Sequence, residues 1–147
     1  MEIRKLNQDE TLKALKLVWD TFLKFEAPDY SEEGIKTFND CINDPSFIGA
    51  LEFYAAFEHG KIVGVLATRS NGSHIALFFV DGKYHRKGIG RKLFEVVSKK
   101  NQSNKMTVNS SPYAVEIYRR LGFINTNTEQ VMNGMRYIPM VFTKEIK

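Results

Sequence analysis

The sequence predicts a single-domain α/β fold with a mixed, mainly antiparallel central sheet flanked by helices. Strand-like apolar runs and helix-like patterns of period 3.6 alternate in the order β-α-α-β-β-β-α-β-α-β-β. The 147 residues suit one ordinary domain, and no repeat, low-complexity segment or linker interrupts them. The composition, 43% hydrophobic and 26% charged, is that of a globular protein. We therefore treat residues 1–147 as one domain.

The chain opens with a strand at residues 2–6, after which Asn7 and Glu10 resemble a helix-capping pair. The helix that follows ends at Pro28, because proline cannot continue a helical hydrogen-bond ladder. Its expected buried stripe consists of Leu12, Leu15, Val18, Phe22 and Phe25.

A second helix is capped by Ser31 and runs to about Ile42, and residues 46–52 are expected to be irregular. Cys41 lies on the apolar side of this helix and is the single cysteine, so the chain forms no intrachain disulfide. This favours a reducing, cytoplasmic setting. A buried structural thiol is preferred over a catalytic nucleophile, since no histidine lies close in sequence.

Three strands come next, joined by two tight turns. Residues 53–58 and 61–68 are paired through the turn His59-Gly60, and the turn at residues 70–72 leads into a strand at 73–80.

A last strand at residues 135–143 follows the turn Asn133-Gly134. Pro139 within it indicates an edge, a bulge or a bend. Because unpaired edges are commonly covered by a partner, we expect a homodimer. We expect no membrane partner, since no apolar run reaches the ~18–20 residues of a spanning helix, and the N-terminus lacks a signal-peptide pattern.

The most informative stretch is residues 79–90, where an apolar run meets a short basic turn with two glycines and then a helical pattern. The first turn of a helix has unpaired N–H groups and the positive dipole end, and glycine lets a phosphate approach the backbone. A dinucleotide fingerprint is excluded because Leu93 stands where a third glycine is needed, and no P-loop motif occurs.

The second informative stretch begins with a short strand at residues 105–109. Ser111 and Pro112 then mark a helix start, and Gly122 marks its end. One face of this helix carries Ala114, Ile117, Tyr118 and Leu121.

Taken together, these motifs resemble the GCN5-related N-acetyltransferase (GNAT) superfamily, whose members move an acetyl group from acetyl-coenzyme A to an amine. The resemblance covers the whole chain in element order and residues 75–124 in motifs. Two positions depart from the family pattern. His85 stands where glutamine or arginine is usual, which puts that side chain's contact in doubt, and Gly82 replaces a common proline and should loosen the turn.

The resemblance implies acetyl-coenzyme A as cosubstrate and a set of residues that bind it. These are Phe78, Val80, His85, Arg86, Lys87, Gly88, Ile89, Gly90, Arg91, Asn109 and Tyr118. In relatives the strand ending at Val80 splays from its neighbour, and the pantetheine arm lies in the gap. The Val80 N–H would polarise the thioester carbonyl, and Tyr118 would protonate the leaving thiolate.

Deprotonation of the amine is not assigned, and Asp81, Glu52 and ordered water stay open. The acceptor is expected to contact residues 22–30, 43–53 and 128–136. These segments and their borders hold aromatic and acidic side chains, namely Phe25, Tyr30, Phe47, Tyr54, Glu26, Asp29 and Asp44. A polyamine, an amino acid, an aminoglycoside-like compound and a protein amine all stay open. No metal is expected, because the three histidines are scattered and those at turns, His59 and His74, should be exposed.

Positive charge is concentrated in one part of the chain. The formal net charge is +4, and residues 83–105 hold eight Lys or Arg and one acid. We favour the phosphates of coenzyme A over nucleic acid as the partner, because the charge coincides with the two-glycine turn and no nucleic-acid motif is visible. The rival functions are a non-catalytic acyl-coenzyme A sensor and a nucleotide- or nucleic-acid-binding module.

Overall fold

The computed structural model describes residues 1–144 and contains an eight-stranded sheet of order β1-β2-β3-β4-β5-β8-β6, with β7 paired to β8. The strands are β1 (Glu2–Lys5), β2 (Glu52–Glu58), β3 (Lys61–Arg69), β4 (His74–Val80), β5 (Lys105–Ser110), β6 (Ile124–Asn125), β7 (Gln130–Met132) and β8 (Met135–Thr143). The helices are α1 (Thr11–Thr21), α2 (Glu32–Ile42), α3 (Pro45–Gly49), α4 (Ile89–Lys100) and α5 (Val115–Leu121). The predicted α/β class and mainly antiparallel sheet are confirmed; β4–β5 is the parallel pair.

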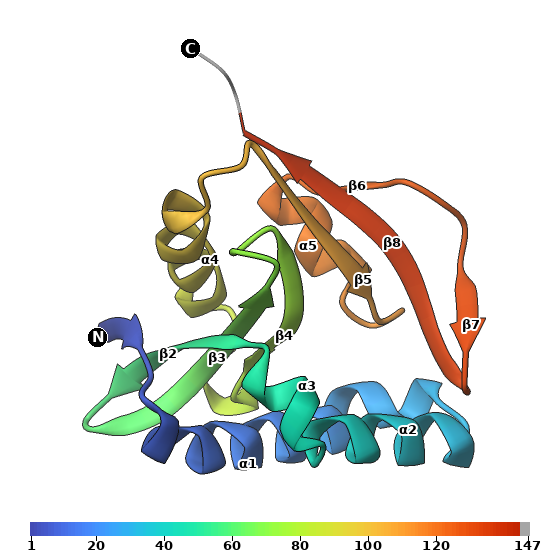
Figure 1. Ribbon diagram of the computed structural model, residues 1–147, viewed down its shortest axis with the longest axis horizontal. Helices are drawn as coiled ribbons and strands as arrows, with labels where there is room; N and C mark the ends of the chain where they lie inside the picture. Colours follow the sequence, from blue (N-terminus) through green and yellow to red (C-terminus); the bar gives the residue numbers. More distant parts are fainter. Residues whose placement is uncertain (145–147) are drawn as a thin grey trace.

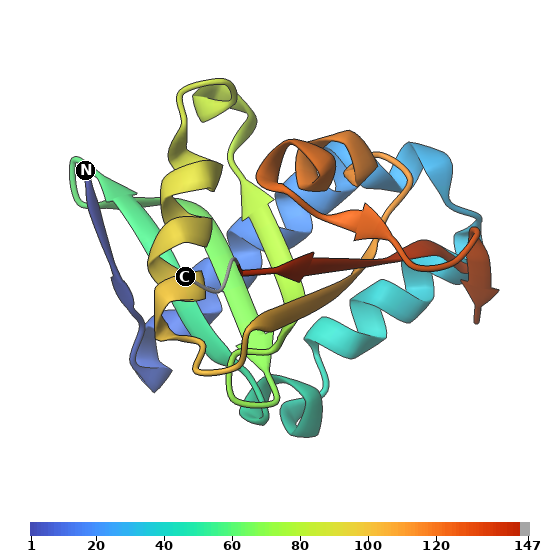
Figure 2. The same cartoon turned by 90° about the horizontal axis from the view of Figure 1, so that it is seen from above.

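The helices cover the two faces of the sheet (Figures 1 and 2). On one face, α1 and α2 bury a core with β2, β3 and β4, centred on the fully enclosed Phe22. On the other face, α4 and α5 bury a second core around Leu93 and Phe123. The turn of residues 81–88 follows the end of β4 and leads into α4.

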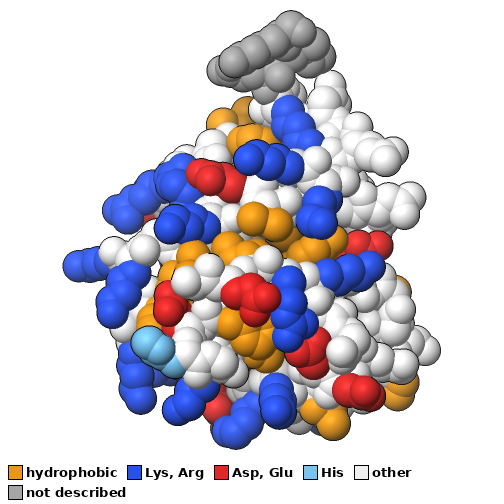
Figure 3. Space-filling view, turned by 90° about the vertical axis from the view of Figure 1, so that its left-hand side faces the viewer, with side chains coloured by type: hydrophobic (Ala, Val, Ile, Leu, Met, Phe, Trp, Pro, Cys, Tyr) orange, Lys and Arg blue, Asp and Glu red, His pale blue; other side chains and the backbone are white. Residues whose placement is uncertain are grey.

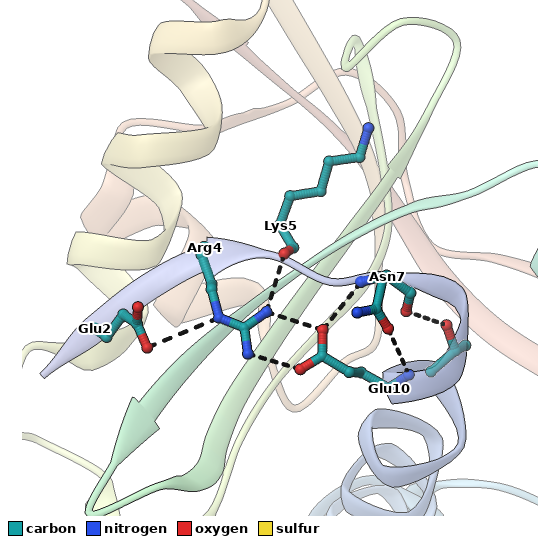
Figure 4. Close-up of polar contacts among 6 residues, drawn as sticks. Glu2, Arg4, Lys5, Asn7 and Glu10 are labelled. Carbon is teal, nitrogen blue, oxygen red and sulfur yellow. Dashed lines mark hydrogen bonds and ion pairs between the residues drawn. The ribbon is translucent and has the colours of Figure 1, made fainter.

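The junction between β1 and α1 confirms the predicted capping pair (Figure 4). Asn7 accepts a hydrogen bond from the Glu10 N–H, and the Glu10 carboxylate accepts one from the Asn7 N–H. Arg4 donates two further hydrogen bonds to Glu10, at 2.8 and 2.6 Å. Because the first turn, Gln8–Glu10, is a 3₁₀ turn, α1 begins only at Thr11.

The buried stripe of α1 differs from the prediction at its first position. Leu12 is 79% exposed, whereas Ala14, Val18 and Phe22 are fully buried at a spacing of four residues. After Thr21 the helix widens into a π-helical turn, Phe22–Glu26, in which the Ala27 N–H donates to the Phe22 carbonyl. A 3₁₀ turn at Ala27–Asp29 then contains Pro28, which ends the helical run as expected.

Two other helix starts differ from the prediction. Residues 45–49, within a stretch expected to be irregular, form the short helix α3, because Asp44 caps it and Pro45 suits its first turn. Helix α5 begins at Val115 instead of directly after Ser111. The Ser111 hydroxyl still accepts a hydrogen bond from the Ala114 N–H, so the predicted cap organises the preceding turn.

Strands β4 and β5 separate after a very short pairing, as expected. Their register contains two pairs, His74 with Thr107 and Ile75 with Val108. The expectation that His74 is exposed is wrong: it is half-buried, with Nδ1 2.7 Å from the Thr107 hydroxyl, and burial lowers its pKa to about 4.

Strand β8 is not an edge along its length. It pairs with β5 on one side and with β6 and β7 on the other. The Pro139 carbonyl accepts a hydrogen bond from the Thr126 N–H, so the missing Pro139 N–H faces the side where β6 has ended. The homodimer stays a prediction, but the unpaired edge that motivated it is not present. Within the described residues, no helix is both long and apolar enough to cross a membrane.

Candidate active site

A cavity of about 350 Å³ opens where β4 and β5 separate. One wall is the end of β4 and the turn that follows it, the floor includes the start of α4, and the opposite wall is α5. The π-helical turn at the end of α1 closes one side with Phe25 and Glu26. We call this the first cavity. It joins the turn before α4, the phosphate-type turn of residues 81–88, to Tyr118.

The turn before α4 has the backbone shape that an anion site needs. Gly88 precedes the helix in the left-handed conformation, with φ of 78°, and Arg86 is also left-handed, at 63°. A Cβ at Gly90 would lie 3.5 Å from the Phe78 ring, over the floor of the cavity. The unpaired N–H groups of the first helical turn are therefore approachable. Around them, Figure 3 shows Lys and Arg side chains spread over the face that includes α4.

The basic side chains of this turn have different roles. Arg86 and Arg91 line the first cavity, and Arg91 also donates a 2.8 Å hydrogen bond to the Arg120 carbonyl, which ties α4 to α5. Lys87, predicted to bind the cofactor, lies outside the cavity wall with its ammonium 5.3 Å from the centre of the Tyr84 ring.

The backbone of Val80 faces the gap. The Asp81 N–H donates to the Val63 carbonyl of β3 at 2.9 Å, and N–H groups alternate in direction along a strand. The Val80 and Phe78 N–H groups therefore point away from β3, toward the space between β4 and β5. This is the orientation expected for pairing with an extended ligand and for polarising its carbonyl.

The side chain of His85 holds the end of β4. Its Nε2 donates to the Val80 carbonyl at 2.7 Å, and its ring packs on Phe25 with centroids 4.7 Å apart. Gly82 makes room for this packing, because a Cβ there would lie 2.7 Å from the Phe25 ring. Whether glycine also loosens the turn stays a prediction; its small size lets Phe25 close over the turn.

Tyr118 projects from α5 between Phe78 and Phe123, making edge-on ring contacts at centroid distances of 5.9 and 5.3 Å. The Tyr118 side chain is buried and lines the first cavity. Among the described residues, the one fully enclosed side-chain polar atom without a hydrogen-bond partner is the Thr68 hydroxyl oxygen. The Tyr118 hydroxyl is therefore not fully enclosed, and it opens to the space of the cavity. Burial, and then the Glu26 charge, raise the pKa of Tyr118. The phenol therefore stays protonated and able to donate.

A second cavity, of about 190 Å³, lies on the other side of Tyr118. It shares with the first cavity the residues Glu26, Phe78, Phe79, Ala114 and Tyr118. Its remaining wall comes from α2, α3, β4, β5 and the start of β8, together with Tyr30 and Ser111. Asn109, predicted to contact the cofactor, lines this second cavity and not the first.

The comparisons with known proteins agree with this geometry. The model of a family described as the acetyltransferase (GNAT) domain matches residues 26–144. The chain belongs to the GNAT acetyltransferase family. A search among curated protein sequences finds no match.

Solved GNAT structures show the same fold. A GCN5-related N-acetyltransferase from Rhodopseudomonas palustris has a TM-score of 0.83 and 19% identity, covering 97% of this chain and 94% of that one. PaiA N-acetyltransferase from Thermoplasma acidophilum, in complex with coenzyme A, has a TM-score of 0.69 and 19% identity, covering 97% and 98%. Aminoglycoside 6′-N-acetyltransferase from Enterococcus faecium has a TM-score of 0.64 and 13% identity, covering 100% and 99%.

Neither carboxylate considered as a general base lines the first or the second cavity of this GNAT domain. Asp81 accepts a hydrogen bond from the Lys83 N–H and caps its own turn. Glu52 lies at the start of β2, 3.9 Å from the Lys5 ammonium. Each side chain is held at its own strand end, and neither lines the first or the second cavity.

Glu26 is the carboxylate that lines both cavities. It is four residues after the buried Phe22, and side chains at this spacing share one side of a helix. Burial raises its pKa to about 7, against the opposing effect of the Ser111 hydroxyl, and Asp29 adds to the rise. From the sequence, Glu26 was only one of several acids expected near the acceptor. Its distinguishing signal is its position directly before Ala27-Pro28, where the helix changes course toward the sheet.

The other residues proposed to shape the acceptor site are divided. Tyr30 and Phe47 line the second cavity, and Phe25 lines the first. Tyr54, Asp29 and Asp44 line neither. Within residues 1–144 no group of three or more His, Cys, Asp or Glu side chains is placed to hold a metal ion.

Proposed function

We propose that this GNAT domain is an acetyl-coenzyme A-dependent N-acetyltransferase that acts on a primary amine by direct attack. The observation that carries the proposal is the first cavity, which connects an approachable helix N-terminus to a tyrosine hydroxyl past two free strand N–H groups. A pyrophosphate suits the helix end, and an extended arm suits the open side of β4. The fit supports acetyl-coenzyme A over a ligand that carries phosphate alone.

The reaction needs the acetyl group to pass from sulfur to nitrogen. The amine nitrogen bonds to the carbonyl carbon, the C–S bond breaks, and the sulfur leaves with the electron pair. The Val80 N–H donates to the carbonyl oxygen as negative charge develops on it. The Tyr118 hydroxyl, which faces the same space, protonates the leaving sulfur.

The test is acetyl-coenzyme A-dependent thiol release over a panel of primary amines, together with acetyl-coenzyme A binding. We expect binding and amine-dependent release. Binding without release for any amine would indicate an acyl-coenzyme A sensor, and salt-sensitive nucleic-acid binding without competition from coenzyme A would indicate the basic-turn module.

A further inference from the structure

The charged residues around the second cavity indicate which kind of substrate it can receive. Among the described residues that line it, Glu26 is the one with a formal charge, and no lysine or arginine takes part. Aromatic and aliphatic groups make up most of the rest, including Tyr30, Phe38, Phe47 and Met135. The wall therefore offers one negative charge at one end and an uncharged, mainly apolar surface elsewhere, with Thr37, Asn109 and Ser111 as its neutral polar side chains.

The position of that single charge is fixed by the fold. Glu26 lies where the two cavities meet, beside Tyr118 and Ser111. An ammonium paired with it would place its nitrogen at the entrance to the first cavity. The body of the same molecule would then extend into the second cavity, toward α2 and β8.

Met135 brings the β7–β8 hairpin to one end of the second cavity. Thr37 of α2 donates a 2.6 Å hydrogen bond to the Asn133 carbonyl, and Tyr30 donates to the Arg136 carbonyl at 3.2 Å. Gly34 and Gly134 meet backbone to backbone, since a Cβ on either would overlap the other. These contacts hold the hairpin against α2, beside a cavity of about 190 Å³. An apolar cavity of about 150 Å³ can hold a benzene ring, so a compact apolar group fits a space of this size.

We propose that the acceptor is a monoamine with a compact apolar body, and that Glu26 binds its ammonium and takes the protons its nitrogen loses. This rests on the proposed function. A polyamine or aminoglycoside would bring further positive charges against an apolar wall, and a free amino acid would bring a carboxylate that no cation there could pair. Burial of such unpaired charges is costly.

The nitrogen of a bound ammonium loses two protons in the transfer, one before it can attack and one as the amide forms. The bound ammonium first gives one proton to the Glu26 carboxylate, and this proton passes to solvent, which leaves a neutral amine beside a free carboxylate. As the N–C bond forms, the nitrogen gives its second proton to Glu26, and Tyr118 gives one to the departing sulfur, which leaves as the thiol. The proton on Glu26 then replaces the one lost by Tyr118, because the two groups line the same cavities. A carboxyl with a raised pKa is a stronger base than an ordinary one.

Matched amines test the class of acceptor. The rates are compared for 2-phenylethylamine and L-phenylalanine, which differ by a carboxylate, and for pentylamine and 1,5-diaminopentane, which differ by a second ammonium. We expect each added charge to lower kcat/KM by about tenfold or more, the effect of one poorly compensated group. A higher kcat/KM for the diamine or for the amino acid would overturn the inference while leaving the proposed function in place.

The role of Glu26 is tested with Glu26→Gln, which keeps the shape and removes the charge. We expect kcat/KM for 2-phenylethylamine to fall by about 10²–10⁴-fold, as for loss of a general base. Acetyl-coenzyme A should still raise the thermal midpoint of the variant, and the further rise that 2-phenylethylamine gives to the coenzyme A complex of the wild type should be lost. An equal amine-induced rise in both proteins would overturn the inference, and this holds even if no amine is acetylated.

Discussion

His85 Nε2 lies 2.7 Å from the carbonyl oxygen of Val80, across the turn that joins β4 to α4. Carbonyl oxygens only accept hydrogen bonds, so this ring nitrogen carries a proton and acts as the donor. The contact leaves the Val80 N–H free on the same side of the strand, facing the first cavity. The imidazole thus anchors the one backbone unit proposed to polarise the substrate.

Replacing His85 should separate anchoring from cofactor binding. His85→Ala removes the donor to the Val80 carbonyl and the packing on Phe25. We expect kcat to fall by roughly tenfold or more, which is less than the 10²–10³-fold loss when an oxyanion donor is removed altogether. His85→Gln can still donate to the Val80 carbonyl and should keep most of the activity. Equal activities of the two variants, measured at saturating acetyl-coenzyme A, would contradict the anchoring role.

Gly90→Val should abolish cofactor binding. Its side chain would stand over the cavity floor near Phe78 and Val80. Acetyl-coenzyme A raises the thermal midpoint of the wild type because it binds only the folded state, and we expect that rise to disappear in the variant. Gly49→Val is the matched control, since a Cβ at Gly49 meets nothing within 4 Å and lies outside both cavities. A full rise in Gly90→Val would place the cofactor elsewhere.

Gly34→Ala should act on the acceptor and not on the cofactor. The added methyl overlaps the Gly134 carbonyl, so the β7–β8 hairpin must move away from α2. Overpacking of this kind costs about 1–3 kcal/mol of stability. We expect KM for the amine to rise several-fold while the affinity for acetyl-coenzyme A is unchanged, with Gly49→Ala as control. A stability loss with no change in amine KM would show that the hairpin does not shape the acceptor site.

The sequence carries enough local information to predict the elements around the cofactor turn. Gly88, Gly90 and the periodic apolar residues of α4 are neighbours in the chain, so their joint geometry is visible in the pattern. The same is true of Ser111 and Tyr118 at the other wall.

The second cavity could not be predicted in this way. It depends on contacts between α2 and the β7–β8 hairpin, such as Thr37 with Asn133, which lie 96 residues apart. Lys87 and Asn109 lie outside the first cavity, which spacing alone does not show, because the direction of a side chain at a turn or strand end depends on such packing. Glu26 was not singled out as a candidate base, because a π-helical turn leaves no periodicity signal of its own.

Tyr118→Phe should slow the reaction without loosening the site. The ring keeps its edge-on contacts with Phe78 and Phe123, so stability should change by about 1 kcal/mol at most, the net value of a hydrogen bond. Loss of the proton donor should lower kcat by about 10²–10⁴-fold. The affinity for acetyl-coenzyme A should stay within a few-fold, since Tyr118 lies apart from the phosphate-type turn. A rate within about threefold of wild type would exclude Tyr118 from the chemistry.

The burial of Glu26 should be measurable as a dependence of stability on pH. Its pKa is about 7 in the folded protein against 4.5 as the unperturbed value, so the folded state holds this proton more tightly. The slope of unfolding free energy with pH is then negative between these values: the contribution is fully present below pH 4.5 and is lost as pH rises through 7. The shift corresponds to an upper limit of about 3 kcal/mol.

Glu26→Gln isolates this effect, because the amide is neutral at every pH. We expect the variant and the wild type to be equally stable near pH 4, and the variant to be more stable by about 1–3 kcal/mol near pH 8. His74, whose lowered pKa gives the opposite slope, is present in both proteins and cancels in the difference. Chemical denaturation of both proteins from pH 4 to pH 8 makes the measurement. A difference in unfolding free energy that stays constant across this range would mean that the Glu26 carboxylate is solvated. A difference that widens with pH would mean that the Glu26 charge, held where the two cavities meet, lowers the stability of the folded protein.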